Sequence, residues 1–226
     1  MSRSFLLVLP LLAACGSPQE PESAPTPVWD NFPFDGSRTW EFVNTDATVP
    51  YKLVAHSDGI PDEAFEGHNV YPVTYSTDCV TGDCEDELLR TIWWSSDIVD
   101  GVLIHAYEEG SWSPTYEPPL RLSPPDSTFD TPIETITDGF EWTSRLEAFE
   151  HCPVHMNTDW GPDCARFVVE DGDDEAWTNE GLTGTWWAIK GVGVVAFELE
   201  GETGRWQLSG FECEPTEDDE ECVGVW

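Results

Sequence analysis

Residues 194–211 read VVAFELEGETGRWQLSGF, and this stretch decides the fold. In its first half Val195, Phe197 and Leu199 alternate with smaller or charged residues, which is the pattern of a strand with one face on a core. The GETG segment at 201–204 supplies two glycines for the positive φ angles of a tight turn. The stretch therefore predicts an antiparallel hairpin in which residues 195, 197 and 199 face the core.

Similar alternation between turn signals continues through most of the chain, and no long stretch has a helical period. The fold class predicted is all-β and mainly antiparallel, with one large curved sheet that forms a half-barrel or a barrel. The strands are expected near residues 39–43, 51–56, 69–76, 89–95, 101–107, 139–144, 146–150, 164–170, 185–190, 194–200 and 205–211.

Little helix is expected. Residues 61–67 (PDEAFEG) and 85–89 (EDELL) are each predicted to form a helical turn or two. Residues 116–130 (YEPPLRLSPPDSTFD) contain two Pro-Pro pairs, which exclude a helix and predict an extended crossover along a sheet edge.

The N-terminus has the layout of an exported protein. Arg3 precedes ten mostly apolar residues, Phe5 to Ala14, which is the length of a signal-peptide core and about half of a bilayer span. The following Leu12-Ala13-Ala14-Cys15 resembles the lipobox of bacterial lipoproteins, in which the cysteine is joined to diacylglycerol and the chain is cut before it. Cys15 is therefore the predicted lipidation site, and the alternative is an ordinary secretory signal that ends near a cysteine.

These features divide the chain into three parts. Residues 1–14 are the predicted lipoprotein signal peptide. Residues 15–27 are the lipidated cysteine and a tether with four prolines, which spans up to roughly 35 Å in polyproline geometry. Residues 28–226 form a single β-rich domain. Gly16 resembles the outer-membrane sorting pattern, so we expect a lipid-anchored protein of the bacterial envelope, in the outer membrane.

The chain is strongly acidic. It has 45 Asp and Glu against 9 Lys and Arg, and cleavage before Cys15 removes Arg3 and no acid. Nucleic acid is excluded as a partner, because binding it needs cations that displace counterions from the phosphates. Contact of the protein surface with anionic head groups is similarly disfavoured, so the lipid anchor is the expected link to the membrane.

Seven cysteines are present, and Cys15 is the odd one. Six cysteines allow 15 connectivities, but each neighbouring pair brackets a polar loop, which favours sequential pairing. The predicted disulfides are Cys79–Cys84, Cys152–Cys164 and Cys213–Cys222. Such bonds require an oxidising compartment, in agreement with export.

Two motifs resemble binding sites. Residues 191–196 (GVGVVA) match the GxGxxA dinucleotide fingerprint, but they open an alternating strand and not the helix that a pyrophosphate needs, so we interpret them as a tight turn or bulge. His151 and His155 flank Cys152 at a spacing that zinc could use. A disulfide at Cys152 and the intervening proline argue against it, and no metal is predicted there.

Acidic clusters at 171–175 and 217–221 offer oxygen ligands without the spacing of an EF-hand, so solvated turns are favoured over a weak calcium site. The sequence has no GxSxG or HExxH motif. We expect a protein that is not an enzyme, has no catalytic residues and uses no cofactor.

Several stretches resemble a type of exported β-rich bacterial lipoprotein that is common in myxobacteria and their relatives. The matching pieces are NFPFDGSRTWEF, DGVLIHAYEEG, YEPPLRLSPP, GFEWTS and TWWAIKGVGVVAFELEGETGRWQLSGF, within residues 31–211. The pattern is distantly similar to LolA-like carriers, whose curved sheet cradles acyl chains. The resemblance implies a similar β-rich fold and assigns no functional residues.

Two functions follow as expectations. Trp93-Trp94 and Trp186-Trp187 place one indole on each face of the sheet, which favours non-catalytic binding of a hydrophobic small molecule at residues that the sequence does not identify. The other explanation of these pairs is that helices or loops cover the second face of the sheet. The alternative is a structural or interaction lipoprotein that displays acidic, disulfide-clipped loops to an unknown protein partner or to calcium.

Overall fold

The computed structural model describes residues 32, 34–65, 67–79, 87–97, 100–123, 132–137, 140–154, 164–171, 181–189 and 191–214. All of its regular elements are β-strands, and the described residues contain no helix. The strands are β1 (Arg38–Asn44), β2 (Tyr51–Ser57), β3 (Tyr71–Cys79), β4 (Leu88–Asp97), β5 (Gly101–Glu108), β6 (Thr115–Ser123), β7 (Ile133–Thr137), β8 (Phe140–Glu150), β9 (Cys164–Asp171), β10 (Gly184–Ile189), β11 (Gly193–Leu199) and β12 (Trp206–Cys213).

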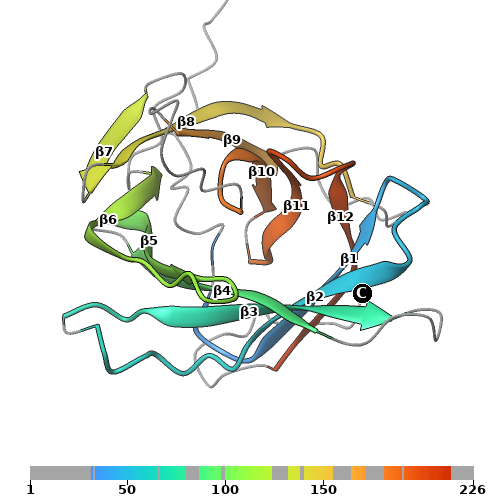
Figure 1. The fold of residues 1–226 in the computed structure, drawn as a ribbon, viewed down its shortest axis with the longest axis horizontal. Coiled ribbons are helices and arrows are strands. Elements are labelled where there is room, and N and C mark those ends of the chain that lie inside the picture. Colours follow the sequence, from blue (N-terminus) through green and yellow to red (C-terminus); the bar gives the residue numbers. More distant parts are fainter. Residues whose placement is uncertain are drawn as a thin grey trace, which may run out of the picture.

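The strands form one antiparallel sheet in the order β6-β5-β4-β3-β2-β1-β12-β11-β10-β9-β8-β7, and Figure 1 shows it curved into a nearly closed barrel. The predicted all-β, barrel-like class is confirmed. The first and last strands of the chain close on one side, because β1 and β12 share a backbone ladder from Arg38↔Cys213 to Asn44↔Trp206.

The two edge strands of the sheet, β6 and β7, meet on the other side through side chains. Thr137 Oγ1 accepts from the Glu117 amide at 2.8 Å, and Thr135 Oγ1 accepts from the Arg121 amide at 3.3 Å. Ser144 on β8 donates its hydroxyl to the Leu122 carbonyl at 2.6 Å. These hydroxyls satisfy backbone groups that a neighbouring strand would otherwise pair.

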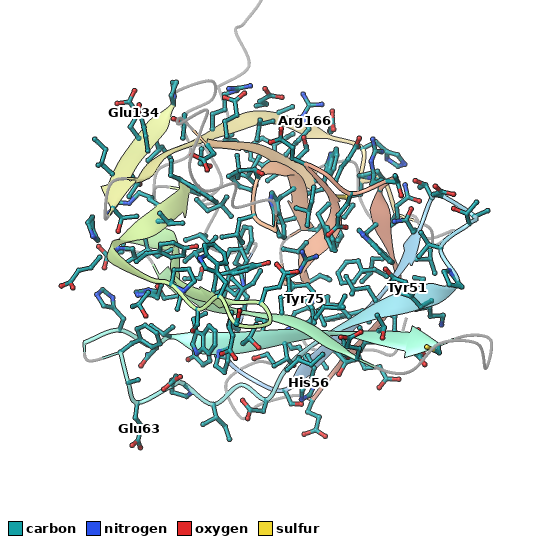
Figure 2. All side chains as sticks on the ribbon, in the orientation of Figure 1. Tyr51, His56, Glu63, Tyr75, Glu134 and Arg166 are labelled. Carbon is teal, nitrogen blue, oxygen red and sulfur yellow. A yellow bond between two sulfur atoms is a disulfide. The ribbon has the colours of Figure 1, made fainter. Side chains whose placement is uncertain are left out.

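The interior is lined as the alternation predicts. Val195, Phe197 and Leu199 are 0, 0 and 3% exposed, while Glu198 between them is exposed. Figure 2 shows side chains filling the space that the strands enclose, with Tyr75 among them, while Glu63 and Glu134 point away from the barrel.

Three local predictions were wrong, one on a strand and two on helices. The stretches 139–144 and 146–150 belong to one strand, β8, which continues through a bulge between Leu146 and Ala148. The extended segment predicted along a sheet edge at 116–130 is confirmed over residues 116–123, which belong to the edge strand β6, and residues 124–130 lie outside the described residues; β7 was not foreseen.

Neither predicted helix forms in the described residues. Residues 61–65 make turns because the Asp62 side chain accepts from the Ala64 amide at 2.9 Å, an alternative to helical bonding. Leu88 and Leu89, from the second predicted helix, are instead the first residues of β4, where Leu88 is exposed and Leu89 is half-buried.

Candidate ligand site in the barrel lumen

The centre of the barrel holds a column of aromatic rings. Trp94 on β4 contacts Trp186 on β10 with ring centroids 6.1 Å apart, and Trp186 stacks on Phe197 at 5.3 Å. In the strand order β4 and β10 stand six positions apart in either direction round the barrel, so this contact crosses its diameter. The lumen is therefore packed at its middle.

One end of the column is occupied by a segment that belongs to no strand. Phe32 and Phe34 precede β1, yet they are only 1% and 6% exposed. Phe32 contacts Trp94 at 6.0 Å and Phe167 at 5.9 Å, while Phe34 stacks on Trp94 at 5.8 Å and on Tyr71 at 6.4 Å. The lumen thus encloses two rings supplied by the chain's own N-terminal side.

Gly36 turns the chain from the lumen into β1. Its φ of 116° lies in a region that side chains disfavour. The backbone of Gly36 is also approached closely by Gly59, where an added Cβ would lie 2.4 Å from Gly36 atoms. This glycine pair lets the segment enter the barrel beside the β2–β3 connection.

The other end of the column carries a buried cation. Arg90 on β4 is 4% exposed, and its guanidinium lies 5.4 Å from the Tyr75 ring centre and 5.9 Å from that of Phe197. Its Nη1 pairs with Glu202 Oε1 at 3.3 Å. Burial opposes this charge, but Glu202 and Tyr107 outweigh burial and raise the pKa of Arg90.

Polar groups around Arg90 form a connected network. Trp206 Nε1 donates to Glu202 Oε2 at 2.7 Å, and the Tyr107 hydroxyl donates to Glu109. Burial raises the pKa of Tyr75 to about 12 against the opposing effect of Arg90. Burial, followed by the Glu109 hydrogen bond, also raises the pKa of Tyr107. A cation held among neutral rings in this way can bind a carboxylate and brings no nucleophile to it.

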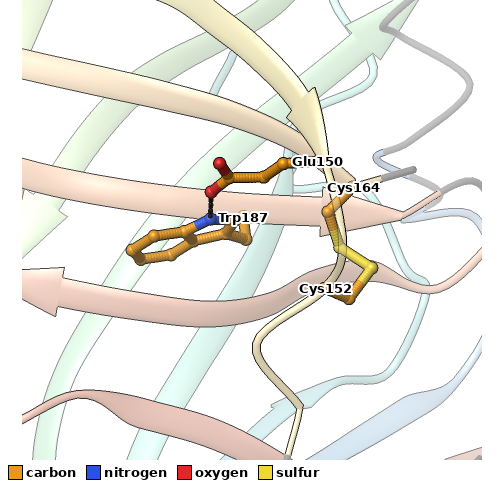
Figure 3. Close-up of a disulfide and its surroundings, with 4 residues drawn as sticks. All are labelled: Glu150, Cys152, Cys164 and Trp187. Atoms are coloured by element: carbon orange, nitrogen blue, oxygen red, sulfur yellow. Dashed lines mark hydrogen bonds between the residues drawn. A yellow bond between two sulfur atoms is a disulfide. The ribbon is translucent and has the colours of Figure 1, made fainter. Parts of the chain in front are cut away.

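The two tryptophan pairs behave as predicted, with one indole on each face. Trp94 and Trp186 point into the lumen, whereas Trp93 Nε1 donates to Asp62 at 2.9 Å on the outside. Trp187 Nε1 donates to Glu150 at 2.7 Å, as Figure 3 shows. The outward indoles are thus bonded to acids of the loop and of β8.

One predicted disulfide lies within the described residues. Cys152 and Cys164 are bonded, with an S–S distance of 1.99 Å, beside Glu150 and Trp187 (Figure 3). Cys79 and Cys213 are also disulfide-bonded. Cys79 pairs with Tyr51 at one end of β2. Cys213 pairs with Arg38, which in turn pairs with Ser57 at the other end of β2. The two cysteines are therefore about 20 Å apart, which is too far for a disulfide between them. Cys84, Cys222 and the predicted lipidation site Cys15 lie outside the described residues.

The histidines gather in a place that the sequence did not indicate. His105 on β5 is 3% exposed, shares a 2.8 Å hydrogen bond with Ser95 and has the His68 ring 5.2 Å away. Burial, then His68, lowers the pKa of His105 to about 4 against the effect of Asp100. The described residues contain no group of three or more metal-ligating side chains. His151 is exposed, and His155 lies outside the described part.

The remaining motifs were placed as follows. The GVGVVA stretch opens β11 after a turn, with Gly191 and Gly193 at φ 77° and 89°, as interpreted from the sequence. Of the two acidic clusters, only Asp171 is described, and residues 172–175 and 217–221 are not. Among the described residues no helix is long and apolar enough to cross a membrane.

Comparison of the chain with protein-family models, with curated proteins and with solved structures finds no match.

Proposed function

We propose that this protein is a non-catalytic, lipid-anchored component of the bacterial envelope whose barrel lumen binds a hydrophobic ligand. The observation that carries the proposal is the position of Phe32 and Phe34. These rings are buried in the lumen, although they belong to none of the strands among the described residues. A segment of this kind occupies the place that a hydrophobic ligand would take.

The energetic comparison allows exchange. Withdrawing two phenylalanine side chains from an apolar site costs about 1.5–3 kcal/mol each. A twelve-carbon chain gains about 0.8 kcal/mol for every CH₂ that it buries. An alkyl chain of that length therefore outweighs the two rings once most of it is enclosed.

Dodecanol binding tests the proposal with a neutral probe. We expect the full chain with Phe32→Ala and Phe34→Ala to bind one dodecanol more tightly than the wild type by about a hundredfold or more, because the competing rings are gone. Phe42→Ala is the matched control. It removes an equally buried ring, but from β1, where it contacts Phe197 at 5.2 Å. Failure of the folded double variant to bind dodecanol, or equal binding by Phe42→Ala, contradicts the proposal.

The anchor is proposed to be Cys15, from the lipobox alone. Three acyl chains on this residue would exceed the two signals that stable attachment needs. Cys15→Ser should abolish palmitate labelling and membrane fractionation. A mature N-terminus other than Cys15, or wild-type protein released by washing, contradicts the assignment.

An interaction role is the second candidate, and the Cys152–Cys164 bond favours it, because this bond closes a loop of eleven residues at one rim. Such a role predicts capture of a specific partner that is lost when the bond is reduced. An unchanged melting temperature on addition of calcium would exclude the calcium version of this role.

A further inference from the structure

A strap crosses the outer face of β4 and β5. It is the β2–β3 connection, described over residues 58–65 and 67–70, and it forms no strand over these residues. Asp62 ties it to β4 by accepting from Trp93 Nε1 at 2.9 Å, and the Asp62 amide closes its base by donating to the Val70 carbonyl at 2.7 Å. Most of the described residues between these two are exposed. Such a segment opens more easily than the strands beneath it, because it can leave without breaking a backbone ladder.

His105 on β5 is the residue that the strap covers. The ring centres of Phe65 and His68 lie 5.5 and 5.2 Å from that of the imidazole, and His105 is only 3% exposed. From β4 the Ser95 hydroxyl shares a 2.8 Å hydrogen bond with its Nε2. Burial of this kind disfavours the charged form of an imidazole. The closed strap therefore selects neutral His105.

The charges around His105 leave this preference in place. The charged or titratable groups described on the outer side of the surrounding elements are Asp58, Asp62, Glu63 and His68 on the strap, Asp100 in the β4–β5 turn, Glu108 on β5, and Glu117 and Arg121 on β6. Figure 2 shows Glu63 pointing away from the barrel. Burial, followed by His68, lowers the pKa of His105 to about 4, and Asp100 opposes them. An imidazole released into water titrates near 6.5.

We infer that the β2–β3 connection is an acid-released strap, which opens from β4 and β5 when His105 takes up a proton. A group whose pKa is lowered in the closed state stabilises that state above pH 6.5, and this contribution is lost as the pH falls toward 4. Opening returns the imidazolium to water and breaks the bond between Asp62 and Trp93. Strap release goes beyond the proposed function and does not depend on what the lumen binds.

Solvent exchange of the Trp93 indole proton tests the strap, because this proton forms the bond to Asp62. Its protection is the factor by which exchange is slowed relative to free tryptophan at the same pH. We expect this protection to fall about thirtyfold between pH 8 and pH 5, the ratio set by titration near 6.5 when open and near 4 when closed. Trp187 is the matched control in the same chain, since its Nε1 donates to Glu150 at 2.7 Å on β8. Its protection should change less than about twofold.

Two substitutions assign the titration. His105→Gln keeps a polar partner for Ser95 and cannot take up a charge, so the protection of Trp93 at pH 5 should stay within about twofold of its value at pH 8. His68→Gln removes the neighbouring imidazole that disfavours the charged form of His105, so the fall should be smaller than in the wild type.

His56→Gln is the matched control variant, because His56 also shares a hydrogen bond with a hydroxyl, that of Thr39 at 3.0 Å, but is exposed on β2. It should show the wild-type fall. A wild-type fall below about threefold, or an equal fall at Trp187, overturns the strap. An undiminished fall in folded His105→Gln overturns the assignment to His105. If His105→Gln does not fold, His68→Gln and the comparison of the two indoles decide the question.

Discussion

The two ends of the lumen are closed in different ways. At one end Arg90, Glu202 and Trp206 form charged and directional bonds between strands and the β11–β12 turn. At the other end Phe32 and Phe34 lie in the barrel through ring contacts alone among the interactions described for them. Ring contacts depend on apolar area, whereas ion pairs depend on geometry. The two ends therefore differ in the kind of bonding that holds them, and their responses to substitution should differ accordingly.

The largest effect is expected where the two ends meet. Phe197 contacts Trp186 at 5.3 Å and lies under the Arg90 guanidinium. Phe197→Ala should lower the free energy of unfolding by roughly 3–5 kcal/mol, the usual cost of removing a buried phenylalanine. Urea denaturation measures it, and a loss under about 1 kcal/mol would mean that the two ends are not joined through this ring.

The next effect tests the arginine end by itself. Glu202→Ala should cost about 2 kcal/mol or more, because it leaves a buried guanidinium without its carboxylate. Glu198→Ala removes an exposed partner of Arg205 and should cost about 0–1 kcal/mol. Equal costs in chemical denaturation would show that the Arg90 pair is no stronger than a surface pair.

A smaller loss is expected at the phenylalanine end. Phe34→Ala should cost about 1–2 kcal/mol, less than the roughly 3–5 kcal/mol expected for Phe42→Ala, because the segment before β1 can shift toward the space left by the ring. Thermal unfolding of the two variants side by side checks the order. A larger loss for Phe34→Ala would make this segment part of the fixed core.

The smallest effect on stability at neutral pH is expected from Tyr75, because its contribution changes only at alkaline pH. The pKa of Tyr75 is raised to about 12 in the folded protein, and an unfolded tyrosine titrates near 10. A raised folded pKa contributes stability that is complete below pH 10 and is lost as the pH rises from 10 to 12. Melting temperatures should therefore fall over that range, and Tyr75→Phe should reduce the slope. An identical slope in the variant would contradict the assignment to Tyr75.

The sequence was informative where one face of a strand is apolar. Val195, Phe197 and Leu199 alternate cleanly and face the lumen as predicted. The alternation of residues along β4 also indicated that Arg90 is buried, since Arg90 lies on the same face of the strand as Ile92 and Trp94. An arginine in an apolar series is usually placed at the surface, because its burial depends on partners distant in sequence.

Other features depend on contacts that no local pattern contains. Strand β7 turns Thr135 and Thr137 inward, and these hydroxyls bond β6 amides about fifteen to twenty residues away in the chain. Phe32 and Phe34 follow a proline-rich stretch with no strand periodicity, so only the closed barrel shows where they lie. Ser95 and His105 similarly meet through the pairing of β4 with β5.

The most direct test of the exchangeable segment is ¹⁹F NMR with 4-fluorophenylalanine at position 32, compared with the same label at position 42. Both rings are 1% exposed, but only Phe42 belongs to a strand. Saturating dodecanol should move the position 32 resonance to its solvent-exposed shift and leave the strand label in its buried environment. If dodecanol saturates the protein while the position 32 resonance stays unchanged, or if it does not bind at all, the lumen is a fixed core and not a ligand site.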